Sequence, residues 1–214
     1  MIDFNKREVF TVDNFIPELY QDFLYEKYTY RSWWRLEGLN IPTSYKNIDD
    51  QNRLIDPNNP IKNNIEESYQ FSFGSYDGPQ NVFENEDLNP FHLIHYLQIQ
   101  TNFQYIFSPI RCKINFQPFN SNFKKTSHNS PHVDYDTFDF KRWTMIYYIN
   151  DSDGDTLIFN ETWEGVPIKN FTIDKKISPK RGRAVIFPGD RFHCGTTPII
   201  SKARIVANIN FTLN

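Results

Sequence analysis

Short runs in which apolar and polar residues alternate dominate the second half of the chain. Residues 111–116 and 205–213 both alternate in this way. Successive side chains of a β-strand point to opposite faces, so both runs predict half-buried strands. Four further β-rich runs, separated by turn sequences, lie at residues 143–149, 156–159, 171–173 and 183–187. Six short strands at this spacing predict a β-sandwich or a jelly roll.

The first half of the chain carries helical patterns. Apolar residues recur at helical spacing over residues 17–25, and Asn14 just before them is a suitable N-cap. A second helix is expected over residues 88–103, where apolar residues again fall on one face. Residues 31–65 are rich in Asn, Asp and Pro and predict a long loop region with short helical pieces.

The length of the chain and its aromatic content indicate one folded domain. With 214 residues, 17% of them aromatic, the chain has enough mass and enough rings for a real core. We therefore expect a single α+β domain over residues 1–214. Residues 1–110 would supply helical and loop support and the substrate groove, and residues 111–214 would form the jelly-roll core.

Charge and cysteine content exclude several classes of function. The net charge is −3 and the pI is about 6.0, so no basic surface for nucleic acid or an anionic membrane is expected. No apolar run approaches the ~20 residues of a membrane span. Cys112 and Cys194 are too few for a disulfide framework or a four-thiolate zinc site. Without a basic-then-apolar leader pattern, we expect a cytoplasmic protein.

The richest chemical signal is the segment His132-Val133-Asp134. On an extended segment, residues two positions apart point to the same face, so the His132 imidazole and the Asp134 carboxylate converge. One distant imidazole would complete the two-His-one-carboxylate set that holds Fe(II) on one face. His193, which follows a Pro-Gly-Asp turn, is the candidate. A surface turn would also accommodate the His-x-Asp pair.

Arg204 stands near the start of the last apolar strand. Burying an arginine there is costly unless an anion pairs with it. An exposed strand end would explain the residue without any ligand. A bidentate clamp for the carboxylate of a bound cosubstrate is the functional interpretation.

These residues and the segments between them resemble the 2-oxoglutarate/Fe(II)-dependent dioxygenases, especially the prolyl 4-hydroxylase-like branch. The matching elements occur in family order, and they are His132-Val133-Asp134, residues 144–150, 154–159 and 182–187, His193 and Arg204. The chain is also similar to short stand-alone oxygenases of marine tailed phages, which would place it in a host cytoplasm. The family fold is a double-stranded β-helix, a jelly-roll variant, here with supporting N-terminal helices.

The resemblance also implies roles for individual residues. His132, Asp134 and His193 would ligate Fe(II), with 2-oxoglutarate and O2 as cosubstrates. Arg204 and Tyr148 would bind the distal carboxylate of 2-oxoglutarate. The implied reaction is hydroxylation of a substrate with release of succinate and CO2.

Two further polar positions follow from the same resemblance. Thr144 lies on the same strand face as Tyr148 and is expected to help bind 2-oxoglutarate. Family members carry another polar residue upstream of His-x-Asp, for which Asn115 and Gln117 are the candidates. The substrate itself stays open, with peptidyl proline or another amino-acid-like group as the default and a small metabolite as another possibility.

Other functions compete with this one. A jelly-roll binding or virion-associated protein could keep the motif without catalysis, and a zinc hydrolase could use the same three ligands. The Arg204–Tyr148 pair argues against the hydrolase, which needs no dicarboxylate clamp.

Several isolated residues also have two interpretations, and we expect the structural one for each. Cys194 next to His193 is expected to be a buried small hydrophobe, since neighbours on a strand face opposite ways. His92 and His95 are expected on a solvated helix face and His128 in a plain loop. Trp33 and Trp34 could line a substrate groove, but aromatic core packing is preferred.

Overall fold

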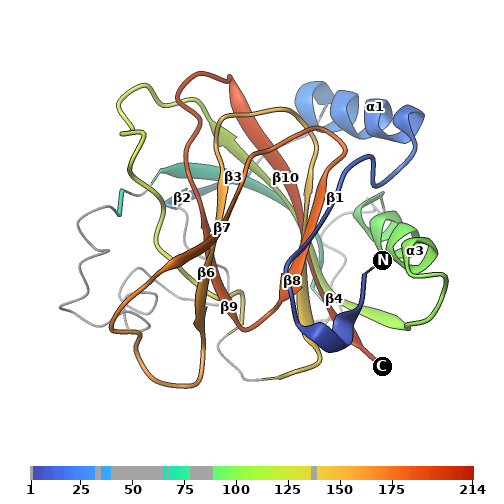
Figure 1. Ribbon diagram of the computed structural model, residues 1–214. Coiled ribbons are helices and arrows are strands. Elements are labelled where there is room, and N and C mark those ends of the chain that lie inside the picture. Colours follow the sequence, from blue (N-terminus) through green and yellow to red (C-terminus); the bar gives the residue numbers. More distant parts are fainter. Residues whose placement is uncertain (1, 32–34, 40–64, 67, 78–88, 136–138) are drawn as a thin grey trace.

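The structure is a computed structural model that describes residues 2–31, 35–39, 65–66, 68–77, 89–135 and 139–214 (Figure 1). Within these residues two antiparallel sheets form the centre of the molecule. The larger sheet has the order β1-β8-β5-β10-β4-β3-β2, and the smaller has the order β7-β6-β9. This arrangement is that of a jelly roll and confirms the predicted α+β fold.

The strands of the larger sheet are β1 (Phe10–Val12), β2 (Arg35–Leu39), β3 (Tyr69–Asp77), β4 (Phe107–Pro118), β5 (Arg142–Tyr148), β8 (Ala184–Pro188) and β10 (Ala203–Leu213). Those of the smaller sheet are β6 (Thr156–Thr162), β7 (Ile173–Ile177) and β9 (Arg191–Gly195). The helices are a 3-10 turn at Phe4–Lys6, α1 (Glu18–Glu26) with a π-helical turn at Lys27–Arg31, and α3 (Asn89–Gln100).

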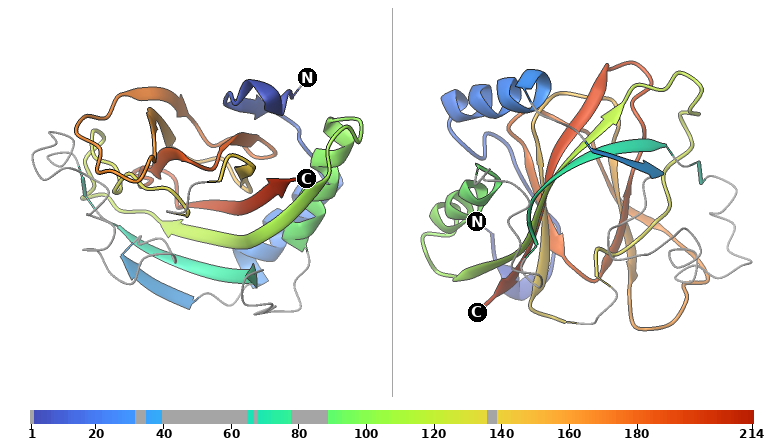
Figure 2. Two further views of the ribbon diagram at one scale, coloured as in Figure 1. Left: turned by 90° about the horizontal axis from the view of Figure 1, so that it is seen from below. Right: turned by 180° about the vertical axis from the view of Figure 1, so that it is seen from behind.

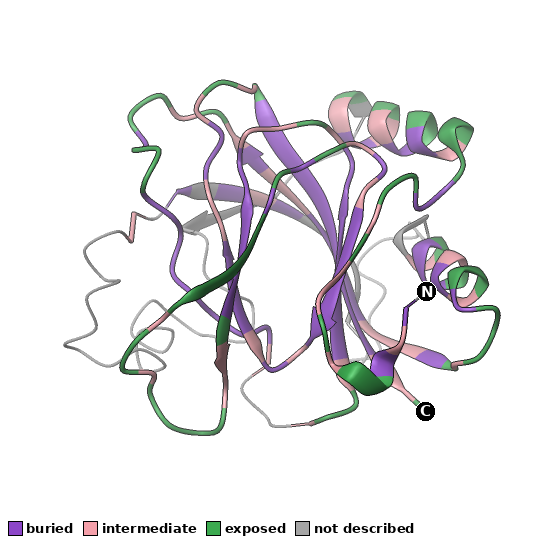
Figure 3. Cartoon of the chain, in the orientation of Figure 1, coloured by how far each residue is buried: buried purple, intermediate pink, exposed green. Residues whose placement is uncertain are grey.

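The larger sheet packs against helices on one face and against the smaller sheet on the other (Figure 2). On the helix side, Leu24 of α1 and Leu97 of α3 join Cys112, Ile114 and Ile209 in the main hydrophobic cluster. Between the sheets a second cluster is formed by Ile146, Tyr148, Ile158, Ile177, Val185, Phe187 and Val206. Burying apolar side chains on both faces makes the central strands the most buried part of the molecule, whereas β7 is largely exposed (Figure 3).

The sequence predicts the two main helices and the six expected strands close to their observed positions. Three strands were not expected, namely β1, β2 and β3, and β2 lies within residues 31–65, where a loop region with short helical pieces was predicted. β1 is short, with Phe10 and Val12 opposite Ile186 and Ala184, and its pairing depends on the strand β8 far away in the sequence. No helix among the described residues is long and apolar enough to cross a membrane.

Candidate metal centre

Backbone pairing brings His132 and His193 together from distant parts of the chain. The two residues form an antiparallel bridge in which each backbone N–H donates to the carbonyl of the other, at 3.0 and 2.9 Å. Residues directly opposite one another in such a pair project their side chains to one face, and the two imidazole rings lie 4.6 Å apart. The position of His193 after a turn predicts it at the start of a strand, and the structure places it in the middle of β9, because the strand begins two residues earlier at Arg191.

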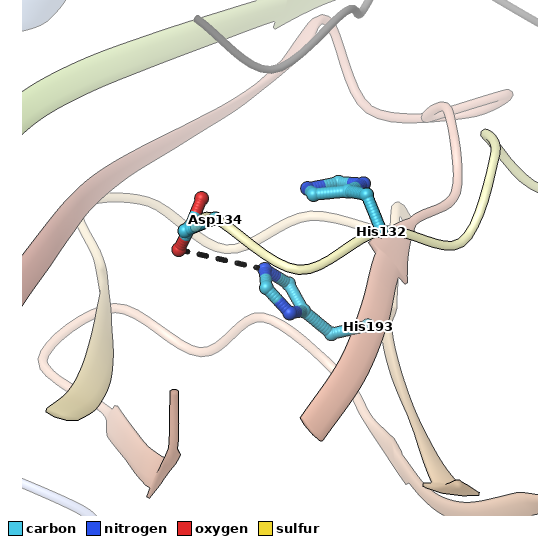
Figure 4. Close-up of side chains that lie close together, drawn as sticks. All are labelled: His132, Asp134 and His193. Atoms are coloured by element: carbon cyan, nitrogen blue, oxygen red, sulfur yellow. Dashed lines mark ion pairs between the residues drawn. The ribbon is translucent and has the colours of Figure 1, made fainter. Parts of the chain in front are cut away.

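Asp134 completes the cluster because it lies two positions after His132 on the same extended segment (Figure 4). Donor atoms of His132, Asp134 and His193 all lie within 4.8 Å of one another, and all three residues are buried. The Asp134 Oδ2 atom is 3.8 Å from the His193 Nε2 atom. Ligands about 2.1 Å from one ion are roughly 3 to 4 Å apart, so the separation of this Asp134–His193 pair suits a shared metal ion.

The two imidazoles present their Nε2 atoms to the cluster. His132 Nδ1 donates to the carbonyl of Ser130 at 2.9 Å, and His193 Nδ1 donates to the carbonyl of Arg191 at 3.2 Å. These bonds fix the tautomer that leaves Nε2 as a lone-pair donor, as in many histidine metal ligands. His193 Nε2 is buried and has no hydrogen-bond partner within the described residues. Such a buried atom is costly without a ligand, so the residues present fit a divalent ion.

Burial also keeps both rings neutral. It lowers the pKa of His132 to about 4, with the neighbouring His193 as a further cause. Burial likewise lowers the pKa of His193 below its ordinary value. Near neutral pH the site therefore offers two uncharged nitrogens, which is the protonation state a metal requires.

The carboxylate of Asp134 is held on both oxygens. Oδ1 accepts a hydrogen bond from Arg111 Nη2 at 2.8 Å, and Oδ2 accepts one from Asn210 Nδ2 at 2.7 Å. Thr144 donates to Oδ2 at 3.3 Å, and Asn208 Nδ2 lies 3.4 Å from each oxygen. Burial alone would raise the pKa of Asp134, but the Arg111 charge, the two imidazoles and the Asn210 amide hold it well below its ordinary value. Asp134 is therefore an anion at any pH near neutral.

Arg204 lies on the same face of β10 as these asparagines, nearer the start of the strand. Side chains alternate along a strand, so Arg204, Asn208 and Asn210 all face the smaller sheet. Arg204 Nη2 donates to Thr156 Oγ1 at 2.8 Å, and the Tyr148 hydroxyl donates to the same oxygen at 2.7 Å. Arg204 Cζ lies 5.9 Å from the centre of the Tyr148 ring. The predicted pair thus converges on a hydroxyl that the sequence did not single out.

This end of the site gathers hydrogen-bond donors around a buried cation. Arg204 is buried, and its Nε has no hydrogen-bond partner within the described residues. Burial lowers the pKa of Arg204 from a very high ordinary value and raises that of Tyr148, so both remain protonated donors. At Gly154 a Cβ would lie 2.7 Å from the Thr196 carbonyl and 2.9 Å from Arg204 Cδ, so glycine is required beside the arginine.

The remaining candidate positions separate into two groups. Thr144 contacts Asp134 and Asn210, so the structure brings it to the triad and not to Arg204. Asn115 stands opposite Val206 and Gln117 opposite Arg204 in the β4–β10 register. Gln117 Nε2 donates to Ser68 and Thr197, and the side-chain oxygens of Asn115 and Gln117 have no partner within the described residues.

Other singled-out residues lie away from the triad or outside the description. His92 and His95 are on an exposed face of α3, and Cys194 is buried in an apolar cluster. His128 is buried, with its Nδ1 atom donating to the Asn129 carbonyl at 2.8 Å, so it is not an exposed loop residue. Trp33 and Trp34 lie outside the described residues.

Four site residues were not predicted, and the signal for three of them was present in the sequence. Arg111 on β4 and Asn208 and Asn210 on β10 are the polar members of alternating strands. The polar face of an alternating strand usually faces solvent, whereas here it faces the site. Thr156 carries no comparable signal.

Comparison with known proteins agrees with this geometry. The profile of the 2OG-Fe(II) oxygenase superfamily matches residues 119–212. No functionally curated protein sequence matches the chain at a significant level.

Solved structures share the fold at low sequence identity. The non-heme alpha-ketoglutarate-dependent epimerase SnoN from nogalamycin biosynthesis is 9% identical, with a TM-score of 0.59 over 97% of this chain and 79% of that one. A Trichoplax adhaerens prolyl hydroxylase in complex with a hypoxia-inducible-factor peptide is 14% identical, with a TM-score of 0.52 over 98% and 84%. A Pseudomonas putida prolyl-4-hydroxylase is also 14% identical, with a TM-score of 0.51 over 99% and 96%.

Proposed function

We propose that His132, Asp134 and His193 bind Fe(II) in a hydroxylase of the 2OG-Fe(II) oxygenase superfamily, whose profile matches residues 119–212. The observation that carries the proposal is the buried His-Asp-His cluster, whose donor atoms lie within 4.8 Å of one another. Arg204, Tyr148 and Thr156 are proposed to bind the distal carboxylate of 2-oxoglutarate.

The chain contributes orientation and charge to the reaction. Fe(II) and 2-oxoglutarate, when bound, supply the oxidising chemistry, in which one oxygen atom of O2 enters the substrate C–H bond and the other enters succinate as CO2 leaves. His132 and His193 donate neutral nitrogens, and Asp134 donates one negative charge. That charge balances half of the divalent ion, so an anionic cosubstrate is favoured at the same centre.

The Arg204 end fixes the other terminus of the cosubstrate. Its guanidinium offers two parallel donors to a carboxylate, and the Tyr148 and Thr156 hydroxyls can add further hydrogen bonds. The apolar residues Val206, Ile146 and Phe187 line the space between the two sheets and exclude water. Exclusion of water strengthens the ion pair and protects reactive species.

For the substrate we propose a peptidyl proline or another amino-acid-like group. Support comes from two proteins of similar fold, the prolyl hydroxylase bound to its peptide and the bacterial prolyl-4-hydroxylase. SnoN, an epimerase from nogalamycin biosynthesis, has a similar fold, so a small-molecule substrate is the alternative.

The experiment is succinate release measured with a panel of proline-containing peptides, free amino acids and small metabolites. Turnover should require both Fe(II) and 2-oxoglutarate, and His193→Ala should abolish it. Turnover of a peptide and not of free proline would support the peptide substrate. Hydrolysis of an ester or amide with Zn(II) and without 2-oxoglutarate would instead indicate a zinc hydrolase. If 2-oxoglutarate does not bind to the Mn(II)-loaded protein, the oxygenase proposal is wrong and a non-catalytic binding protein remains.

A further inference from the structure

Arg111 is a buried cation that contacts the carboxylate of the triad directly. Its Nη2 atom lies 2.8 Å from Asp134 Oδ1, and the two side chains are only 8% and 3% exposed. Its Nε atom donates to Asn210 Oδ1 at 3.0 Å, and Asn210 Nδ2 in turn donates to Asp134 Oδ2. Arg111, Asn210 and Asp134 therefore form a closed ring of hydrogen bonds.

The geometry of the larger sheet sets up this ring. Arg111 on β4 stands opposite Asn210 on β10, and Asn210 stands opposite Thr144 on β5. Directly opposed residues share a face, so three neighbouring strands present three polar side chains at one level. All three contact Asp134, which itself lies outside any strand.

Tyr135 holds the guanidinium from another side. Arg111 Cζ lies 5.3 Å from the centre of the Tyr135 ring, and Arg142 Cζ lies 5.0 Å from it. Such cation–π contacts restrict a guanidinium that is already hydrogen-bonded. Arg142 provides a natural comparison, because it shares the ring but pairs with Asp139 at 3.6 Å.

We propose that Arg111 is a positioning residue that reserves Oδ1 of Asp134 in an ion pair, so that the carboxylate offers the metal Oδ2, which accepts from the neutral groups of Asn210 and Thr144. Oδ2 is the oxygen nearest His193 Nε2, at 3.8 Å. One-oxygen ligation leaves a coordination position open for the cosubstrate. The positive charge of Arg111 also offsets the negative charge of Asp134. The metal-loaded centre therefore keeps more positive charge for the dianion 2-oxoglutarate. The inference rests on the proposed function and deepens it.

The two effects of Arg111 act in opposite directions on the metal and on the cosubstrate. Without the guanidinium, both carboxylate oxygens can reach the ion and a nearby repulsive charge is lost, so metal binds more tightly. The same change fills a coordination position and weakens the attraction for 2-oxoglutarate. A residue with only a structural role would weaken both affinities together, because the site as a whole would loosen.

The test compares wild type with Arg111→Met, Arg111→Lys and the matched control Arg142→Met. Mn(II) affinity is measured by electron paramagnetic resonance of the free ion, and 2-oxoglutarate affinity by calorimetry on Mn(II)-saturated protein under anaerobic conditions. Arg111→Met should bind Mn(II) about 10-fold more tightly and 2-oxoglutarate about 10-fold more weakly, the change expected for roughly 1.4 kcal/mol in each direction. Arg111→Lys should lie between, and Arg142→Met should match wild type.

A second measurement needs no metal. Arg111→Met leaves Asp134 as an uncompensated buried charge, so the metal-free variant should unfold at a lower temperature than wild type. Adding Asp134→Asn removes that charge and should restore part of the loss. If the double variant is less stable than either single variant, the ion pair is not the reason for the placement of Arg111.

The outcomes separate this inference from the proposed function. Mn(II) binding that is absent in wild type, or unaffected by His193→Ala, overturns both. The role of Arg111 alone is overturned by a different result. In that case wild type binds Mn(II) through His193, but Arg111→Met leaves the Mn(II) and 2-oxoglutarate affinities unchanged or weakens both.

Discussion

Arg204 is a buried cation that hydrogen-bonds to a neutral hydroxyl, that of Thr156 at 2.8 Å. A buried charge is costly without a counter-charge, and the guanidinium lies beside Tyr148 on the face that carries the triad. A bound anion would therefore supply the counter-charge that Arg204 needs.

The first prediction concerns the affinity for 2-oxoglutarate. Truncating one partner of a buried charge pair costs about 2–5 kcal/mol, so Arg204→Ala should weaken binding by roughly 30-fold to several thousand-fold. Arg204→Lys should recover part of the affinity, because the charge returns without the bidentate fork. Calorimetric titration into anaerobic Mn(II)-loaded protein measures both. Mn(II) affinity should be nearly unchanged, and equal 2-oxoglutarate affinity in all three proteins would refute the clamp.

At the residue scale, the sequence predicts groups whose chemistry is local and misses those defined by a partner. His132 and Asp134 are two positions apart, so their convergence follows from strand geometry. Arg111 meets Asn210 only because β4 runs beside β10, and Thr156 meets Arg204 only because the two sheets face one another. Neither contact has a signature within a short window of sequence.

At the scale of elements, the turn before β8 depends on one glycine. Gly182 has a φ of +80°, and a Cβ there would lie 2.3 Å from Gln21 Oε1. Gln21 is buried, with its amide donating to the Ile16 carbonyl at 2.8 Å, so it cannot move away freely. The turn therefore packs against helix α1 so closely that no side chain fits at position 182.

Gly182→Ala should destabilise the protein by roughly 2–4 kcal/mol, since it combines a strained backbone with a steric overlap. Gly165→Ala is the control, because Gly165 also has a positive φ of +86° but nothing within 4 Å of the added Cβ. It should cost only about 1 kcal/mol. Urea unfolding of the two variants measures the difference, and equal losses would show that contact with Gln21 is unimportant.

The pairing of β1 with β8 continues into an ion pair. Arg183 donates to Asp13 at 2.6 and 3.1 Å, and Lys180 donates to the same carboxylate at 3.3 Å. The hydrogen bond from Arg183 is the main cause that lowers the pKa of Asp13 to about 2, from an ordinary value of 3.8. Because the folded pKa is the lower one, the contribution is complete above pH 3.8 and is lost as the pH falls through about 2.

The Asp13 side chain is 40% exposed, so solvent screening limits this contribution to about 1 kcal/mol or less. The unfolding free energy of wild type should therefore fall by about that amount more than that of Asp13→Asn between pH 4 and pH 2. The comparison requires unfolding curves at several pH values in that interval. Parallel pH profiles for the two proteins would contradict the assignment.

Strands that pair locally in the sequence were predictable, and strands that complete a distant edge were not. β5 and β8 are predicted by apolar, β-rich runs between turns. β1 has only three residues, Phe10–Val12, and exists because the edge of β8 lies beside it. Tertiary context, which a window of sequence does not contain, decides such short strands.

At the scale of the whole molecule, the candidate metal centre joins segments that are far apart in sequence. His132 follows β4, whereas His193 belongs to β9 of the smaller sheet. A ligand that binds only the folded chain stabilises it by RT ln(1 + [L]/Kd), which is about 2.7 kcal/mol at 100 times Kd.

Mn(II) at about 100 times its Kd should raise the melting temperature by roughly 5–10 °C, because each kcal/mol raises it by about 2–4 °C for a chain of this size. His193→Ala should remove the increase, because it deletes one of the three ligands. Differential scanning calorimetry with and without EDTA tests this. A metal-dependent increase that survives in His193→Ala would place the bound ion elsewhere on the protein.

The α+β jelly roll and the resemblance to the 2-oxoglutarate/Fe(II) oxygenases follow from motifs spread over the second half of the chain. The observed sheets confirm the fold, and the profile of that superfamily matches residues 119–212. The substrate does not follow in the same way. Much of the first half lies outside any matched motif, and the recognition of a substrate depends on side chains that only the complete fold assembles.

The division of β4 and β10 into two faces has a consequence for how this protein can diverge. Cys112, Ile114 and Ile209 serve the core, while Arg111, Asn208 and Asn210 at intervening positions serve the site. Mutations on one face leave the neighbouring positions of the other face in place. A library that varies only the positions facing the smaller sheet would therefore sample new reactivities within an unchanged scaffold. Substitutions that accumulate at the positions facing the helices would alter the thermal stability of the protein while preserving its chemistry.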